Sequence, residues 1–286
     1  MMWLVTFLVL LEFARCGIAT FPTQLVFQSP TGQALENIAV RPSSKLLITS
    51  TVSPTLYTLD PIAANATLDE VYTFPNANAL TGIAEYRRDV YAIAASELND
   101  TSIMIAPGSV IPQSKLTNGL STVPGHPDLV LAADSILGAA FEVNVRTGAV
   151  RVLIQDAAMA PGPPGGPPPP IGINGLHLGT FSRVLLDGGA VEVLGVPRPG
   201  VYDDFAFDSE GRAWVATNPG ALTLFTRLEN GTFEQEIAVG DATGTTVLNG
   251  PSTAAFGRDG ARETKILYVT TRTGQIVAVD TSGGHA

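Results

Sequence analysis

The chain has one cysteine among its 286 residues, Cys16, and that residue lies in an apolar N-terminal segment. A single thiol forms no internal disulfide, and removal of the segment would exclude cysteine catalysis and cysteine–metal sites as well. Charge is also scarce, because Asp, Glu, Lys and Arg make up 15% of the chain, and the net charge is −10 with no basic cluster. We therefore expect neither nucleic acid nor an anionic membrane surface as a partner.

Helical periodicity is lacking after the N-terminal segment. Short β-branched or alternating runs, such as Leu56–Asp60 and Val90–Ala94, follow one another instead. They are separated by turn pairs such as Asn-Gly, Thr-Gly and Asp-Gly, which are typical of hairpins. This pattern predicts an all-β fold.

The N-terminus has the features of a secretory signal peptide. Trp3 to Leu11 is an unbroken apolar run, and Gly17 and Ala19 are small residues at the −3 and −1 positions of a cleavage site. We predict a signal peptide over 1–19 and one domain over 20–286. A buried N-terminal strand is the alternative, because no Lys or Arg precedes the apolar run.

The predicted route is the secretory pathway, with the protein secreted or held in an endomembrane lumen or vacuole. After loss of the signal peptide we expect no stable membrane insertion. Three sequons fit this route and predict glycosylation at Asn65, Asn99 and Asn230. A monomer or dimer is expected.

An apolar-and-turn phrase recurs six times, at a mean spacing of roughly 43 residues. The phrases are Leu35–Val40, Leu80–Ala84, Leu116–Leu120, Ile173–Leu176, Asp203–Phe207 and Gly250–Ala255. Such a period is typical of propeller blades, so the sequence predicts a six-bladed β-propeller with a central channel. Two blades look shortened, one between Asn99 and Leu116 and one between Leu178 and Phe205. The run Gln24–Gln28 is expected to form the outermost strand of the last blade and so close the ring.

In a propeller the innermost strand of each blade lines the channel, and the phrases are the candidates for these strands. They would bring together a set of polar residues: Glu36, Thr81, Asn118, Asn174, Asp203, Asp204, Ser252 and Thr253. The alternative is that pairs such as Asn118-Gly119 only form turns. Because neighbouring residues of a regular strand point to opposite faces, we expect Asp203 in the channel and Asp204 elsewhere.

The segment Asp203–Ala216 resembles the most specific motif of the senescence marker protein / gluconolactonase-like six-bladed propellers, with Asp204 in place of a glycine. In that family a Glu, an Asn and this Asp hold a divalent metal, and a second Asn assists. The resemblance thus implies Glu36, Asn174 and Asp203 as ligands of Ca²⁺, Mg²⁺ or Mn²⁺, with Asn118 assisting. The family's Glu-Gly-Pro-x-Trp is replaced by Glu36–Val40 here.

A fungal branch of the superfamily is more similar still. It shares Glu36–Pro42, Gly172–Gly175 and Ala213–Gly220 with this chain. Branch members with an assigned activity resemble hetero-Diels–Alderases of secondary metabolism, which join an o-quinone methide of the tropolone type to a terpene such as a humulene. The resemblance implies a cyclase with a small hydrophobic substrate.

Two catalytic hypotheses follow, together with a non-catalytic binding propeller as a third. A cyclase needs no cofactor; Asn118, Asn174 or Arg41 would donate a hydrogen bond to the quinone methide, beside Asp203. Its pocket would contain Thr81, Tyr202, Phe205 and Phe256. A lactonase would use a divalent cation held by Glu36, Asn174 and Asp203 to polarise a carbonyl and activate water.

Overall fold

The computed structural model describes most of the chain between residues 21 and 283. The described residues are 21–97, 103–105, 109–111, 113–161, 172–175, 182–183, 191–193, 201–241, 243–244, 247–258, 260 and 263–283. The predicted signal peptide and the sequon residue Asn99 lie outside them.

Antiparallel strands form five four-stranded sheets and one two-stranded ladder. The first three sheets are β2 (Ile38–Val40), β3 (Leu46–Ser50), β4 (Ser53–Leu59) and β5 (Asp69–Thr73); β6 (Ala79–Arg87), β7 (Val90–Ser96), β8 (Ile103–Ile105) and β9 (Ser109–Ile111); and β10 (Thr117–Val123), β11 (His126–Asp134), β12 (Ala139–Asn144) and β13 (Val150–Gln155). The ladder is β14 (Ser182–Arg183) and β15 (Glu192–Val193). The last two sheets are β16 (Val201–Phe207), β17 (Ala213–Asn218), β18 (Ala221–Arg227) and β19 (Phe233–Gly240); and β20 (Pro251–Phe256), β21 (Ile266–Thr271), β22 (Gln275–Asp280) and β1 (Thr23–Gln28).

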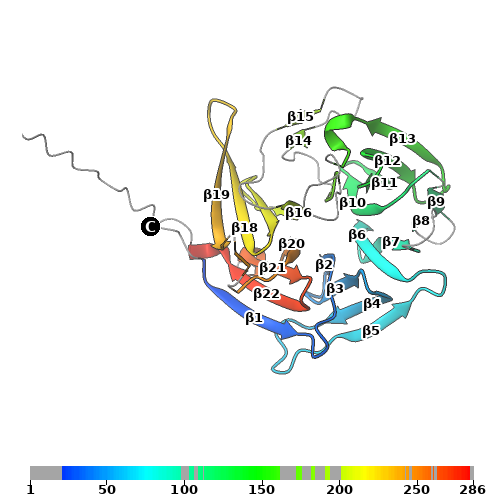
Figure 1. Cartoon of the computed structure of the whole chain (residues 1–286). Helices are drawn as coiled ribbons and strands as arrows, with labels where there is room; N and C mark the ends of the chain where they lie inside the picture. Colours follow the sequence, from blue (N-terminus) through cyan, green and yellow to red (C-terminus); the bar gives the residue numbers. More distant parts are fainter. Residues whose placement is uncertain are drawn as a thin grey trace, which may run out of the picture.

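The sheets stand around a common centre, which makes the fold an all-β propeller (Figure 1). The inner strands β2, β6, β10, β16 and β20 carry five of the six recurring phrases, as the sequence predicts. The described residues contain helical structure only as three 3-10 turns, η1 (Ala157–Met159), η2 (Glu263–Lys265) and η3 (Thr281–Gly283). None of their helical segments has the length and apolar character to cross a bilayer.

The predicted count of six blades is not confirmed. Five sheets are complete, whereas β14 and β15 have two residues each and the phrase around Asn174 carries no strand among its described residues. The blade predicted to be shortened after Asn99 has a full set of four strands, although β8 and β9 are only three residues long.

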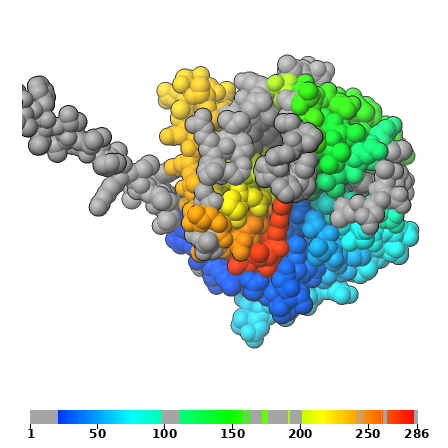
Figure 2. Space-filling model, viewed as in Figure 1, coloured from blue at the N-terminus to red at the C-terminus, as the bar shows by residue number. Residues whose placement is uncertain are grey.

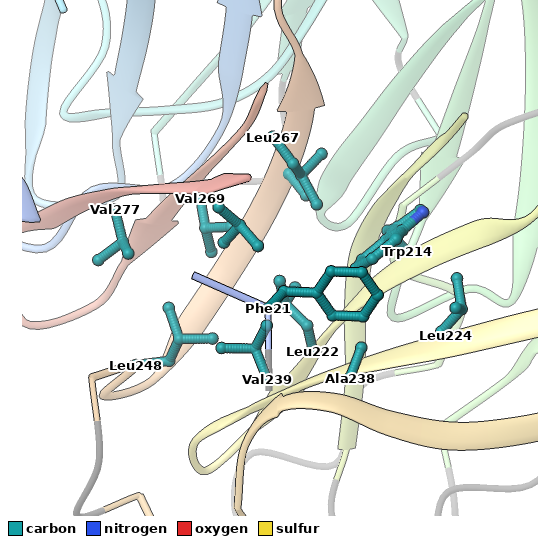
Figure 3. Close-up of a cluster of buried hydrophobic side chains, with 12 residues drawn as sticks. Phe21, Trp214, Leu222, Leu224, Ala238, Val239, Leu248, Leu267, Val269 and Val277 are labelled. Carbon is teal, nitrogen blue, oxygen red and sulfur yellow. The ribbon is translucent and has the colours of Figure 1, made fainter. Parts of the chain in front are cut away.

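The ring closes through the two ends of the described chain, as predicted. β1 pairs antiparallel with β22 and is the outermost strand of the last sheet. Phe21, just before β1, packs edge to face on Trp214 of β17, with ring centroids 4.9 Å apart. Figure 3 shows Phe21 among buried side chains of the last two sheets, including Leu222, Val239, Leu267 and Val269. On the surface, the blue N-terminal part meets the red C-terminal part (Figure 2). The N-terminal strand therefore joins the last sheet and also stabilises its contact with the preceding one.

Hydroxyl groups link neighbouring parts of the ring. Each donates a hydrogen bond to a backbone carbonyl at or near the start of the next inner segment. The pairs are Thr49 Oγ1 to Thr81 O (2.6 Å), Thr81 Oγ1 to Thr117 O (2.7 Å), Ser135 Oγ to Ile173 O (2.6 Å) and Ser252 Oγ to Leu35 O (2.9 Å). The hydroxyl groups of Thr81 and Ser252, which belong to two of the recurring phrases, are therefore used to link neighbouring parts of the ring.

Candidate functional site

A cavity of about 340 Å³ lies along the central channel between the inner strands. Its polar lining residues, Asn37, Asp204 and Thr253, each precede an apolar stretch of an inner strand. The apolar lining residues are Ile38, Ile83, Leu120, Phe205, Ala206, Phe207, Ala254, Ala255 and Phe256. The cavity is thus apolar with one polar end, and its size is typical of small-molecule sites.

The polar end is held by hydrogen bonds from two other sheets to Asp204. Asn37 Nδ2 donates to Asp204 Oδ2 at 2.8 Å, and Thr253 Oγ1 donates to the same oxygen at 3.3 Å. Asp204 Oδ1 accepts from the backbone N–H of Phe205 at 2.9 Å. Buried polar groups that satisfy one another in this way give a rigid wall.

The expectation that Asp204 points away from the channel is wrong. The pairing of β16 with β17 shifts register between Tyr202 and Phe205, so the strand is irregular at the two aspartates. A bulge of this kind breaks the alternation of faces. Asp203 and Asp204 are therefore both directed inward, each 5% exposed, and it is Asp204 that lines the cavity.

Asp203 accepts hydrogen bonds from three side chains of other elements. Its Oδ1 accepts from Asn174 Nδ2 at 2.5 Å, and its Oδ2 accepts from Arg272 Nη2 at 2.8 Å and Asn218 Nδ2 at 3.3 Å. Arg272 lies in the turn between β21 and β22, and Asn218 ends β17. Asp203 and Asn174, predicted to lie together, are in contact.

Glu36 completes a group that we call the channel-mouth cluster: Glu36, Asp203, Asp204 and Arg272. Burial raises the pKa of Glu36 to about 8, and the charge of Asp203 adds to the rise while Arg272 opposes it. Burial also raises the pKa of Asp203, against the lowering effect of Arg272. Because Asp203 accepts three N–H groups and Glu36 accepts none from a described side chain, we assign the proton at neutral pH to Glu36.

The predicted metal ligands do not fit a divalent cation in this arrangement. Such a cation needs oxygen lone pairs directed at one point. Both oxygens of Asp203 are instead turned toward N–H donors, and Asn174 presents its amide nitrogen to Asp203. Within the described ranges, no three carboxylate, imidazole or thiol side chains are placed to hold a metal ion.

The other predicted residues divide between the cavity and the scaffold. Phe205 and Phe256, which the sequence assigned to the pocket, line the cavity. Tyr202 packs edge to face on Phe225 and donates a hydrogen bond to Gln235 Oε1 at 3.1 Å. The Thr81 hydroxyl donates to the backbone carbonyl of Thr117. Asn118 is buried on β10 but is absent from the cavity lining.

Arg41 lies at the other end of the inner strands, against the expectation that it joins Asn118 and Asn174. It follows β2 and forms an ion pair with Asp89, with Nη2 2.7 Å from Oδ2. Nearby, Arg258 donates to Val40 O at 3.1 Å and pairs with Glu85. Arg41 follows β2, whereas Glu36 and Asn37 precede it, so these residues lie at opposite ends of the strand.

Arg272, Asn37 and Asn218 are the functional candidates that the sequence pattern missed. Arg272 sits in a Thr-Arg-Thr-Gly hairpin turn outside every recurring phrase, and no sequence signal marks it. Asn37 could have been proposed from the sequence, because it is a polar residue that directly follows Glu36 in the first recurring phrase. The predicted glycosylation sites Asn65 and Asn230 are exposed in turns.

Comparison with known proteins gives one curated relative and many similar structures. No family profile matches the chain. A protein of a Phoma species named "Putative hetero-Diels-Alderase" is 26% identical over 317 residues, covering 87% of this chain and 86% of its own.

Among solved structures, a "putative gluconolactonase" covers 92% of this chain and 94% of its own, with 14% identity and a TM-score of 0.61. A streptogramin B lyase covers 91% and 98%, with 13% identity and a TM-score of 0.59. These likenesses show the propeller fold. The chain is thus a β-propeller that is distantly similar to a protein named for cycloaddition.

Proposed function

We propose that this protein is a cyclase that binds two apolar reactants in the central cavity and joins them by a hetero-Diels–Alder reaction. The observation that carries the proposal is the cavity itself, with apolar walls and one polar end. The similarity to the Phoma protein supports the same reaction class. The reactants would be an o-quinone methide, as heterodiene, and a terpene alkene such as a humulene.

The reaction depends on the relative position of the two reactants more than on acid–base catalysis. One new C–C bond and one new C–O bond form as the carbonyl, the exocyclic C=C and the alkene rearrange, and no proton or electron pair leaves. Holding two reactants in a near-attack geometry lowers a barrier by up to roughly 7–11 kcal/mol. Rigid walls such as Phe205, Phe207 and Phe256 fit this task, because they fix the apolar faces of both reactants.

The polar end of the cavity suits this mechanism better than hydrolysis. Asn37 and Thr253 both donate to Asp204 Oδ2, and the backbone N–H of Phe205 donates to Oδ1, so the carboxylate is engaged in holding the wall. Both oxygens of the Asp203 carboxylate accept hydrogen bonds from N–H groups, so they are not directed at a metal ion that would activate water. The cyclase is therefore the better supported of the enzymatic hypotheses.

A product assay on the purified protein tests the proposal. An o-quinone methide would be generated in situ with α-humulene, and the adduct analysed by chiral chromatography against a reaction without protein. We expect faster formation of one stereoisomer. Ala255→Phe, which fills the cavity, should abolish that gain, whereas Ala63→Phe on an exposed turn should keep it. A racemic product at the uncatalysed rate would rule out the cyclase.

A further inference from the structure

The channel-mouth cluster contains three buried carboxyl groups and one cation. Glu36, Asp203 and Asp204 are each 5% exposed, whereas the side chain of Arg272 is 43% exposed. Arg272 is thus the member of the cluster that contacts a buried carboxylate while much of its own side chain stays exposed.

The fold fixes Arg272 in this place. Its backbone N–H donates to Gly250 O at 2.7 Å, which holds the β21–β22 turn against the start of β20. Gly250 leaves room for the side chain, because a Cβ there would lie 3.3 Å from Arg272 Cβ. The guanidinium is directed to Asp203 by its ion pair at 2.8 Å.

Most of the guanidinium is left for another acceptor. An arginine has five N–H donors in a planar fork. Among the described residues, the side chain of Arg272 donates one hydrogen bond, from Nη2 to Asp203. Arg41 and Arg258, at the opposite mouth, are used more fully: Arg41 donates from two nitrogens to Asp89, and Nη1 of Arg258 bonds both Glu85 and a backbone carbonyl.

We propose that Arg272 is the cationic centre of this site and binds the conjugated oxygen of the ligand directly, in the role that a divalent metal has in lactonase-like propellers. The oxygen would be a carbonyl, or an ionised hydroxyl conjugated to a ring, at the polar end of an otherwise apolar molecule. Arg272 suits such an oxygen because guanidinium–oxyanion hydrogen bonds are strong and directional.

The position of the site relative to the cavity agrees with this ligand. Asp203, the partner of Arg272, adjoins Asp204, and Asp204 lines the polar end of the cavity. Arg272 does not itself line the cavity, so a ligand whose apolar part fills the cavity would extend its oxygen past Asp204 to reach the guanidinium. In the proposed cycloaddition, the guanidinium would stabilise negative charge that builds on the heterodiene oxygen. The inference rests on the proposed function in that the ligand occupies the central channel.

Equilibrium binding of tropolone tests the proposal without requiring turnover. Tropolone is a small ring with a conjugated, acidic hydroxyl, and its absorbance reports binding. The titration would use the full protein in excess EDTA and again after replacing the chelator with Ca²⁺. We expect the same dissociation constant in both buffers, and an increase of about tenfold or more in Arg272→Met. Arg272→Lys should have a dissociation constant between those of the wild type and Arg272→Met.

The matched control is Arg258→Met, because Arg258 is a partly exposed arginine at the opposite mouth, paired with Glu85. It should leave the dissociation constant for tropolone unchanged, and thermal melting would verify that every variant is folded. The inference is overturned if the wild type does not bind tropolone, if Arg272→Met binds as the wild type does, or if binding is lost in EDTA and restored by Ca²⁺.

The proposed cyclase and the inference fail separately. Tropolone binding through Arg272 without stereoselective adduct formation would remove the cyclase and keep the binding site. Stereoselective adduct formation that Arg272→Met leaves unchanged would keep the cyclase and remove the role of Arg272.

Discussion

Asn37 Nδ2 lies 2.8 Å from Asp204 Oδ2, and this hydrogen bond joins the first sheet to β16 across the polar end of the cavity. Both side chains are almost fully buried. A buried carboxylate that loses a donor costs more than the bond itself contributes, because its desolvation is no longer compensated.

Asn37→Ala is therefore expected to lower the free energy of unfolding by about 1–3 kcal/mol. Urea denaturation followed by circular dichroism measures the change. Gln24→Ala, on the exposed face of β1, is the control and should be close to neutral. Equal stability of the two variants would mean that the contact with Asp204 contributes nothing.

Glu36 makes the stability of the protein depend on pH. Its pKa of about 8 in the folded protein lies above the ordinary value of 4.5, because the buried carboxyl favours its neutral form. Between these two values the unfolded chain has lost the proton and the folded chain keeps it. The contribution of Glu36 to the free energy of unfolding therefore falls as the pH rises through this range.

Glu36→Gln removes the ionisation and keeps the shape. We expect its unfolding free energy to depend less on pH, and to exceed that of the wild type at about pH 8 by on the order of 1 kcal/mol or more. Urea titrations at several pH values give both curves. Glu234→Gln, on the exposed edge strand β19, should follow the wild type. If the curves of unfolding free energy against pH are parallel for Glu36→Gln and the wild type, then Glu36 is not protonated in the folded protein.

Much of the scaffold could be predicted from the sequence because it depends on local patterns. The recurring phrases fall on the inner strands, and Gln24–Gln28 forms most of the strand that closes the ring. These features follow from apolar alternation and turn residues, which short stretches of sequence carry. The spacing could not establish the blade count, because the segment between β13 and β16 has only the two-residue strands β14 and β15 among its described residues.

The site was less predictable because it depends on side-chain direction and on contacts between distant residues. The irregular register of β16 turns both Asp203 and Asp204 inward and places Asp204 at the cavity, whereas regular alternation allows only one of the two to face inward. Arg272 meets Asp203 across 69 positions of sequence, from a turn that no repeat marks. Thr81 and Ser252 belong to the right strands, but their hydroxyls bond the neighbouring backbone.

Gly82 sets the distance between two walls of the cavity. A Cβ at this position would lie 2.8 Å from Leu120 Cγ and 2.9 Å from Asn118 O, both on the neighbouring inner strand β10. One of those contacts is with backbone, so the added methyl group must separate β6 from β10. Overpacking of this kind usually costs about 1–3 kcal/mol.

Gly82→Ala is thus expected to lower the unfolding free energy by that amount and to weaken binding of apolar ligands. Urea denaturation and a titration with α-humulene measure the two effects. Gly283→Ala is the control, because the nearest atom to its Cβ would be Pro22 Cδ at 3.9 Å. If Gly82→Ala is as stable as Gly283→Ala, then β6 and β10 are not held at a fixed distance.

Phe21, just before β1, should be the side chain of the N-terminal segment that contributes most to stability. It is 5% exposed and packs on Trp214 in the cluster between the last two sheets (Figure 3). Phe21→Ala would leave a cavity there and remove an aromatic contact, so we expect a loss of about 3–5 kcal/mol in unfolding free energy. Leu25→Ala, on β1 itself, removes a side chain that is 55% exposed and should cost far less. Urea denaturation compares the two. If both variants lose equally little, β1 stabilises the ring through its backbone pairing with β22 alone, and the contact with Trp214 is incidental.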